Sequence, residues 1–231
     1  MPLSLQSRDV GEITVVQCSG RIVEGVESAA LKDYLAARLP HYPCIVLNLA
    51  DVQFLDSAGL GLLARILTTA RHAHGDLKLC AVPDKIVEVL RITNLRTIFE
   101  SYPSEEDAIA AFYQTATSST PAYQSSREIL HVETSEDVLA YVRHLLGQAG
   151  YGVTSAGTVP DALVLLKAMR PKVVIMGTEL RAARHTQAAQ ALNALADAAS
   201  VIELPADFSR DDAGDAGRQL LDQLRVLLAA R

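Results

Sequence analysis

The most informative part of this chain is the stretch Phe54-Leu55-Asp56-Ser57-Ala58-Gly59-Leu60-Gly61-Leu62-Leu63. An apolar run, residues 44–49, precedes it, and a long amphipathic run, residues 60–73, follows it. The pattern predicts a buried strand, a tight turn that carries one hydroxyl, and a helix. We expect Ser57 at or near the N-cap of that helix, with Gly59 and Gly61 removing side-chain bulk around it.

Two interpretations of this turn are open. A helix N-terminus favours negative charge, so Ser57 could carry a phosphate at an exposed corner that a partner protein can contact. Alternatively, Asp56 and Ser57 only cap the helix, as Asp and Ser do at the end of many strand-to-helix loops.

Composition excludes several classes of protein. The 231 residues are 49% hydrophobic and 21% charged, enough for one or two domains with buried cores. A formal net charge of -6, without a basic block, argues against nucleic acid or an anionic membrane surface as a partner. The N-terminus lacks a leader pattern and no apolar run is long enough to span a bilayer, so we expect a cytoplasmic protein.

Catalytic and cofactor signatures are missing from the sequence. The three cysteines, Cys18, Cys44 and Cys80, lie in apolar runs and read as buried thiols, with no metal-ligand spacing. None of the six histidines accompanies a nucleophile motif, and there is no glycine-rich phosphate loop. We therefore expect no enzyme, no cofactor and no metal.

The first half of the chain alternates strand and helix patterns in the order β-β-α-β-α-β-α-β-α. A hairpin of residues 3–8 and 13–20 is expected to come first. Three helix–strand pairs and a last helix follow, at 27–39 with 44–49, 60–74 with 77–82, 85–94 with a strand from Ile98, and 105–115. Gly75 is expected to end the second of these helices as a C′ glycine.

The motif Asp56-Ser57-Ala58-Gly59-Leu60-Gly61, placed after a hydrophobic strand, resembles the signature of the STAS domain, the fold of bacterial anti-sigma factor antagonists. Residues 19–23 and 89–95 extend the resemblance over residues 1–115. It implies an α/β domain with a mixed β-sheet and helices packed against it. In that family the serine after the aspartate is phosphorylated by a partner kinase, and here that serine is Ser57.

The resemblance implies an anti-sigma factor antagonist that binds an anti-sigma factor serine kinase and is switched off by phosphorylation of Ser57. A PP2C-type phosphatase would reverse the switch. The implied partner-binding residues are Asp56, Ser57, Ala58, Gly59, Leu60, Gly61 and Glu24. Val23 stands where many family members carry an aspartate, with Glu24 adjacent. A scaffold protein that uses the same surfaces without phosphorylation is the alternative.

Residues 116–126 are rich in Ser and Thr and are typical of a flexible linker. After them, strand patterns at 127–133, 172–176 and 200–204, and a further strand entered through the turn at 150–153, alternate with helix patterns at 135–149, 160–170, 182–198 and 213–230. Such alternation predicts a doubly wound parallel sheet.

Residues 127–231 resemble a response-regulator receiver domain, which has a flavodoxin-like fold. The resemblance rests on residues 129–133, 145–153, 172–176 and 201–206. The phosphoacceptor aspartate is replaced by Gly177, and the acidic pair reads Glu133-Thr134. The stretch 207–217 is too short for a full helix and strand before the last helix. We therefore expect a degenerate, truncated receiver-like domain that contacts other proteins, and a homodimer through its sheet edge is a further hypothesis.

Overall fold

The computed structural model describes residues 2–115, 128–177, 199–205, 208 and 213–229. The chain divides into two compact units, Met1–Ile109 and Ala110–Arg231, and each is described by itself. The predicted linker and the predicted helix at 182–198 lie outside the described residues.

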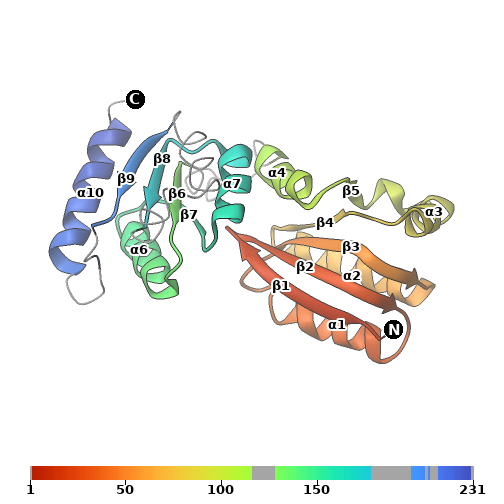
Figure 1. The fold of residues 1–231 in the computed structure, drawn as a ribbon. Helices are drawn as coiled ribbons and strands as arrows, with labels where there is room; N and C mark the ends of the chain where they lie inside the picture. Colours follow the sequence, from red (N-terminus) through yellow and green to blue (C-terminus); the bar gives the residue numbers. More distant parts are fainter. Residues whose placement is uncertain (1, 116–127, 178–198, 206–207, 209–212, 230–231) are drawn as a thin grey trace. The chain divides into compact units, whose positions relative to one another are not determined.

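The first unit is a five-stranded mixed sheet with helices against it (Figure 1). Its elements are β1 (Ser4–Val10), β2 (Ile13–Ile22), α1 (Val26–Ala36), β3 (Cys44–Leu55), α2 (Ser57–His72), β4 (Asp76–Cys80), α3 (Asp84–Ile92), η1 (Leu95–Thr97), β5 (Glu100–Tyr102) and α4 (Glu105–Thr115). The boundary between the two units falls within α4. The strands lie in the order β1-β2-β3-β4-β5, antiparallel for β1 with β2 and parallel elsewhere. The mixed sheet and the element order are as predicted.

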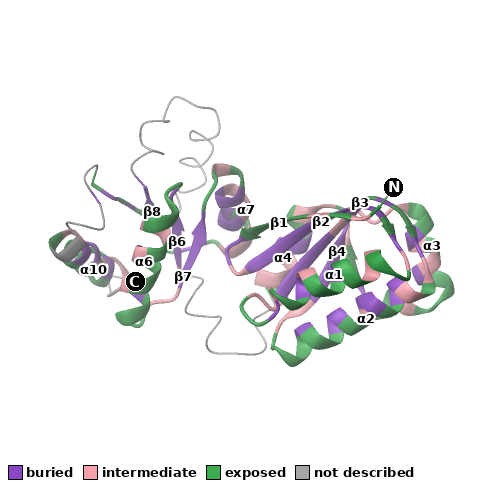
Figure 2. Cartoon of the chain, turned by 90° about the horizontal axis from the view of Figure 1, so that it is seen from below, coloured by how far each residue is buried: buried purple, intermediate pink, exposed green. Residues whose placement is uncertain are grey.

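One face of this sheet is covered by α1 and α2, which lie side by side beneath the strands (Figure 1). Leu31 and Leu35 of α1 and Leu63 and Leu67 of α2 pack with alternate residues of β2, β3 and β4 in one hydrophobic core. The buried strands and the exposed outer faces of both helices are visible in Figure 2. This packing fixes the N-terminal ends of both helices next to the ends of β2 and β3.

The strand before the motif is longer than predicted. β3 continues to Leu55, and α2 begins at Ser57 rather than Leu60, so the turn between them is Asp56 alone. The cause lies in β2, which also extends, to Ile22, and pairs with β3 up to Ile22 opposite Leu55. Residues 50–55, which the local sequence pattern does not assign to a strand, are therefore held in β3 by pairing with β2.

The end of α2 also differs from the prediction. His74, with φ 63°, and not Gly75, takes the left-handed C′ position. The backbone N–H of Gly75 donates to Ala70 O at 2.8 Å and that of His74 to Arg71 O at 3.1 Å, which is a Schellman motif. Gly75 is instead required by close approach, because a Cβ there would lie 2.1 Å from the carbonyl oxygen of Pro43.

The second unit contains a four-stranded parallel sheet in the order β7-β6-β8-β9 among the described residues. Its elements are β6 (Ile129–Val132), α6 (Glu136–Gln148), β7 (Val153–Ala156), α7 (Val159–Met169), β8 (Val173–Met176), β9 (Ser200–Glu203) and α10 (Ala213–Ala229). α6 and α10 share one core with the sheet, and α7 contacts β6 and β7 with a separate set of buried side chains. The predicted parallel α/β domain is therefore present.

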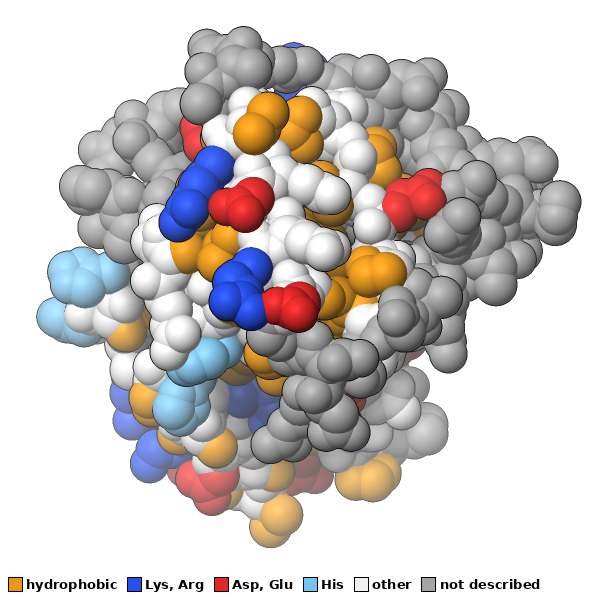
Figure 3. All heavy atoms as spheres, turned by 90° about the vertical axis from the view of Figure 1, so that its left-hand side faces the viewer, with side chains coloured by type: hydrophobic (Ala, Val, Ile, Leu, Met, Phe, Trp, Pro, Cys, Tyr) orange, Lys and Arg blue, Asp and Glu red, His pale blue; other side chains and the backbone are white. Residues whose placement is uncertain are grey.

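The outer surface of α10 carries balanced charge. Two ion pairs, Arg218 with Asp215 and Arg225 with Asp222, each join residues three apart along the helix. In the space-filling view of this side, basic and acidic side chains lie next to each other among hydrophobic ones (Figure 3). Opposite charges so close together cancel at a distance, so this face presents no field of a single sign.

Candidate functional site

The turn between β3 and α2 is organised by Asp56. Its Oδ1 accepts the backbone N–H of Gly59 at 2.7 Å, so Asp56 is the N-cap of α2. Its Oδ2 accepts the backbone N–H of Glu24 at 2.9 Å, from the loop that follows β2. The N–H donors of Gly59 and Glu24, and to a lesser extent the positive charge of Arg21, lower the pKa of Asp56. Asp56 therefore caps α2, as the second interpretation of this turn expects of it.

Ser57 is the first residue of α2, so it lies next to the N-cap, as expected, but it does not cap the helix itself. Its side chain is exposed, and its hydroxyl has no hydrogen-bond partner among the described residues. Because Asp56 makes the cap, the hydroxyl at position 57 is free of any structural task.

The two glycines of the motif have different roles. A Cβ on Gly59 would lie 2.4 Å from the carbonyl oxygen of Ile22, so only glycine lets α2 approach the end of β2 this closely. A Cβ on Gly61 would meet nothing within 4 Å. Gly59 is therefore required by the packing of α2 against β2, whereas Gly61 leaves open space on the exposed side of α2.

The remaining residues predicted for partner binding fall into two groups. Glu24 and Gly61 are exposed and Ala58 is half-buried, so these three can contact a partner together with Ser57. Gly59 and Leu60 are buried and support the turn from inside.

Sequence reasoning missed three exposed residues near this turn. Val26, at the start of α1, is 82% exposed and Phe54 is 50% exposed. The guanidinium carbon of Arg21 lies 5.5 Å from the centre of the Phe54 ring, which is cation–π geometry. Apolar residues such as Val26 and Phe54 are normally assigned to the core, so the sequence carried no signal for their exposure.

A second notable arrangement lies in the second unit, at the C-terminal ends of β6 and β8. Glu133 is buried, and its Oε1 accepts the backbone N–H groups of Thr134 at 2.7 Å and Ser135 at 3.0 Å. A Cβ on Gly177 would lie 2.0 Å from Oε2 of Glu133. The carboxylate of Glu133 thus fills the space in which a side chain at position 177 would begin.

The described part of the chain offers neither a metal-binding cluster nor a membrane-spanning helix. There, no group of three or more His, Cys, Asp or Glu side chains is placed to hold a metal ion. None of the described helices combines the length and apolar character needed to cross a bilayer.

Residues 4–108 match the family model of the STAS domain. A protein of Bordetella bronchiseptica named "Putative anti-sigma factor antagonist BtrV" is 29% identical over 99 residues, which cover 42% of this chain and 85% of that protein. Two solved structures are also similar. An anti-sigma factor antagonist from Mycobacterium paratuberculosis has 27% identity and a TM-score of 0.44, covering 48% of this chain and 93% of its own. The Bacillus cell fate determinant SpoIIAA in its phosphorylated form has 19% identity and a TM-score of 0.40. The match covers 47% of this chain and 98% of the SpoIIAA chain.

The sheet, the turn at Asp56 and the family match agree for the first unit. Residues 4–108 form a STAS domain, and the relative in Bordetella is named as an anti-sigma factor antagonist.

Proposed function

We propose that this protein is an anti-sigma factor antagonist that binds an anti-sigma factor serine kinase through the β3–α2 turn and is released when Ser57 is phosphorylated. The proposal includes residues 1–115 as the binding domain, a cytoplasmic location and reversal by a PP2C-type phosphatase. The observation that carries it is the exposed hydroxyl of Ser57 at the first residue of α2, beside a cap made by Asp56.

Phosphorylation of Ser57 would add about −1.5 to −2 charges and three acceptor oxygens. The N-terminus of α2 tolerates negative charge, and the hydroxyl has no hydrogen-bond partner within the described part of the chain, so the domain keeps its fold. A partner surface fitted to a neutral hydroxyl would instead have to bury an unpaired charge. Weakening a nanomolar complex to a micromolar one takes only about 4 kcal/mol, which such a charge supplies.

The test measures binding of the cognate kinase to Ser57→Ala and Ser57→Asp variants of the full chain. Ser57→Ala should bind like the unmodified protein, and Ser57→Asp should bind much more weakly. Ser101→Asp, at an exposed serine on β5, is the matched control for added charge and should bind normally. Equal binding of both Ser57 variants would refute the switch.

A scaffold without phosphorylation is the second candidate, and the second unit gives the observation that favours it. The strand order β7-β6-β8-β9 supports a flavodoxin-like, receiver-like domain at residues 127–231. Gly177 leaves no phosphoacceptor side chain at the end of β8, and the carboxylate of Glu133 lies where such a side chain would begin. Such a domain would act through protein contacts, including a homodimer through the edge strand β9.

Intact mass separates the two candidates. Incubation with ATP and the cognate kinase should add one phosphoryl group to the full chain and none to Ser57→Ala. A chain that binds the kinase but gains no mass would be a scaffold.

A further inference from the structure

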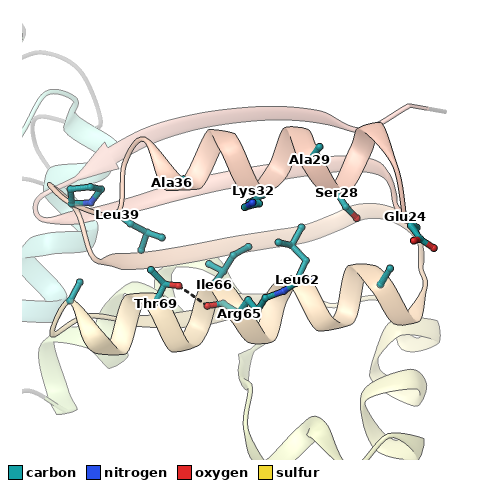
Figure 4. A pocket seen from close by; sticks show the side chains of 13 residues that line it. Glu24, Ser28, Ala29, Lys32, Ala36, Leu39, Leu62, Arg65, Ile66 and Thr69 are labelled. Atoms are coloured by element: carbon teal, nitrogen blue, oxygen red, sulfur yellow. Dashed lines mark hydrogen bonds between the residues drawn. The ribbon is translucent and has the colours of Figure 1, made fainter.

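A groove of about 630 Å³ runs between α1 and α2 on the surface of the STAS domain (Figure 4). It begins at Glu24 and Ala58, beside the N-terminal ends of the two helices, and ends at Leu39 and Ala73 near their C-terminal ends. The groove therefore starts next to Ser57 and follows the whole of α1. Eleven residues of α1 correspond to about 16 Å, or three helical turns.

The floor of the groove is apolar. Leu62 and Ile66 of α2 point into the space between the helices, and Leu39 closes the far end (Figure 4). Ala29 and Ala36 line the α1 side, and their small side chains leave room for an occupant. A third helix could pack here by placing its own apolar ridge between α1 and α2.

The two hydroxyl groups that line the groove already donate hydrogen bonds to backbone carbonyl oxygens. Ser28 Oγ donates to the carbonyl oxygen of Val23 at 2.6 Å, and Thr69 Oγ1 donates to that of Arg65 at 2.9 Å. An occupant would therefore find its polar contacts in the charged side chains of the walls.

Two of those charges are cations on opposite walls. Lys32 projects from α1 and Arg65 from α2, across the groove from each other (Figure 4). Both side chains are exposed, and neither forms an ion pair within the part of the chain that the structure describes. In a chain with a net charge of -6, two unpaired cations that face each other over an apolar floor are a specific feature.

We propose that this groove binds an amphipathic helix of the partner protein, about three to four turns long, with acidic side chains along both edges of its apolar face. Cations on both walls match acids on both edges of a helix, whereas a fatty acid offers a single acidic group at one end. The inference rests on the proposed function, because the bound helix would extend past Glu24 and Ala58 to the turn where Ser57 is modified. Phosphate at Ser57 would then repel the acidic helix at the entrance of the groove.

The probe is a fluorescent, hydrocarbon-stapled peptide of about 14 residues, with leucines at helical spacing and glutamates flanking them. Its binding to the full chain is measured by fluorescence anisotropy, alongside a matched peptide with lysines in place of the glutamates and alongside lauric acid. The glutamate peptide should bind at least tenfold more tightly than the lysine peptide. Lys32→Glu/Arg65→Glu should reverse that preference, and Ala36→Trp, which fills the groove from an exposed position, should abolish binding of either peptide.

Arg96→Glu/Lys167→Glu is the matched control, because it makes the same change in net charge at two exposed sites outside the groove. It should leave the peptide preference unchanged. Equal binding of the two peptides, unchanged preference in the Lys32/Arg65 variant, or tight binding of lauric acid in place of the peptide would overturn the inference.

The kinase distinguishes this inference from the proposed function. If Ser57→Asp releases the kinase but Lys32→Glu/Arg65→Glu does not, the groove inference fails and the switch stands. If the glutamate peptide binds more tightly than the lysine peptide, and Lys32→Glu/Arg65→Glu reverses this preference, the groove stands as a helix-binding site. If Ser57→Asp then still binds the kinase, only the proposed switch fails.

Discussion

The carboxylate of Asp56 accepts the backbone N–H of Glu24 at 2.9 Å, and so connects the loop after β2 to the start of α2. The same carboxylate caps α2 through Gly59 at 2.7 Å. One side chain thus holds together the two segments that flank Ser57.

Asp56→Ala should destabilise the protein by about 1–2 kcal/mol, because it removes an N-cap and leaves the Glu24 N–H without its acceptor. Urea unfolding measures the loss. Asp33→Ala, at an exposed position within α1, is the control and should change stability by less than about 0.5 kcal/mol. The pKa of Asp56 is lowered in the folded state, so its contribution is present above the ordinary Asp pKa and is lost as pH falls below it.

Gly59→Ala and Gly61→Ala should have opposite effects. The first forces a Cβ to within 2.4 Å of the Ile22 carbonyl oxygen and should cost about 1–3 kcal/mol. The second places alanine in open space within α2 and should stabilise by about 0.5–1 kcal/mol. Thermal unfolding of both variants measures the two effects. A stabilising Gly59→Ala would contradict the close approach of α2 to the end of β2.

Gly177→Ala should destabilise the second unit by about 1–3 kcal/mol, because the Cβ meets the carboxylate of Glu133. In a variant that already carries Glu133→Ala, the destabilisation caused by Gly177→Ala should largely disappear. A double-mutant cycle measures this coupling between the two positions. Gly147→Ala, in α6 with nothing within 4 Å of its Cβ, is the control and should be neutral or stabilising. Additive effects of the changes at 133 and 177 would argue against contact between them.

The buried side chain of His131 should make the stability of the folded protein sensitive to acid. His131 lies on β6 opposite Ser155 of β7, and both side chains are buried. Neither ring nitrogen of His131 has a hydrogen-bond partner among the residues that the structure describes. Burial first, and the charge of Arg143 second, lower the pKa of His131 from 6.5 to about 3. Below pH 6.5 the unfolded chain takes up a proton that the folded chain does not. Stability should therefore fall between about pH 6.5 and 3, by up to about 1.4 kcal/mol per pH unit.

His131→Met should flatten that part of the stability profile, as measured by urea midpoints across the same pH range. His144→Gln, at an exposed histidine of α6, is the matched control and should leave the slope unchanged. An unchanged slope in His131→Met would mean that another group takes up the proton.

The sequence predicted the order of the elements because each buried strand and amphipathic helix carries its own periodicity. It placed Ser57 at the start of a helix for the same reason. It could not show that β3 reaches Leu55, since that depends on pairing with Ile22 of another strand. It also could not assign the cap, because Asp and Ser are both good N-cap residues and only the backbone conformation at Asp56 decides between them.

The same limit applies to the groove and to the interior of the second unit. Lys32 and Arg65 lie on two separate helices, and only the packing of α1 beside α2 brings them across from each other. Gly177 reads as a missing aspartate in the sequence, and only the folded chain reveals that Glu133 has taken the space.

The separation of the cap at Asp56 from the hydroxyl at Ser57 has an evolutionary consequence. Under the switch that we propose, mutations at position 57 can create, remove or mimic a regulatory charge without first having to be tolerated by the folding of the domain. A lineage could therefore gain or abandon covalent control of this surface in one step, while the neighbouring aspartate stays under constraint.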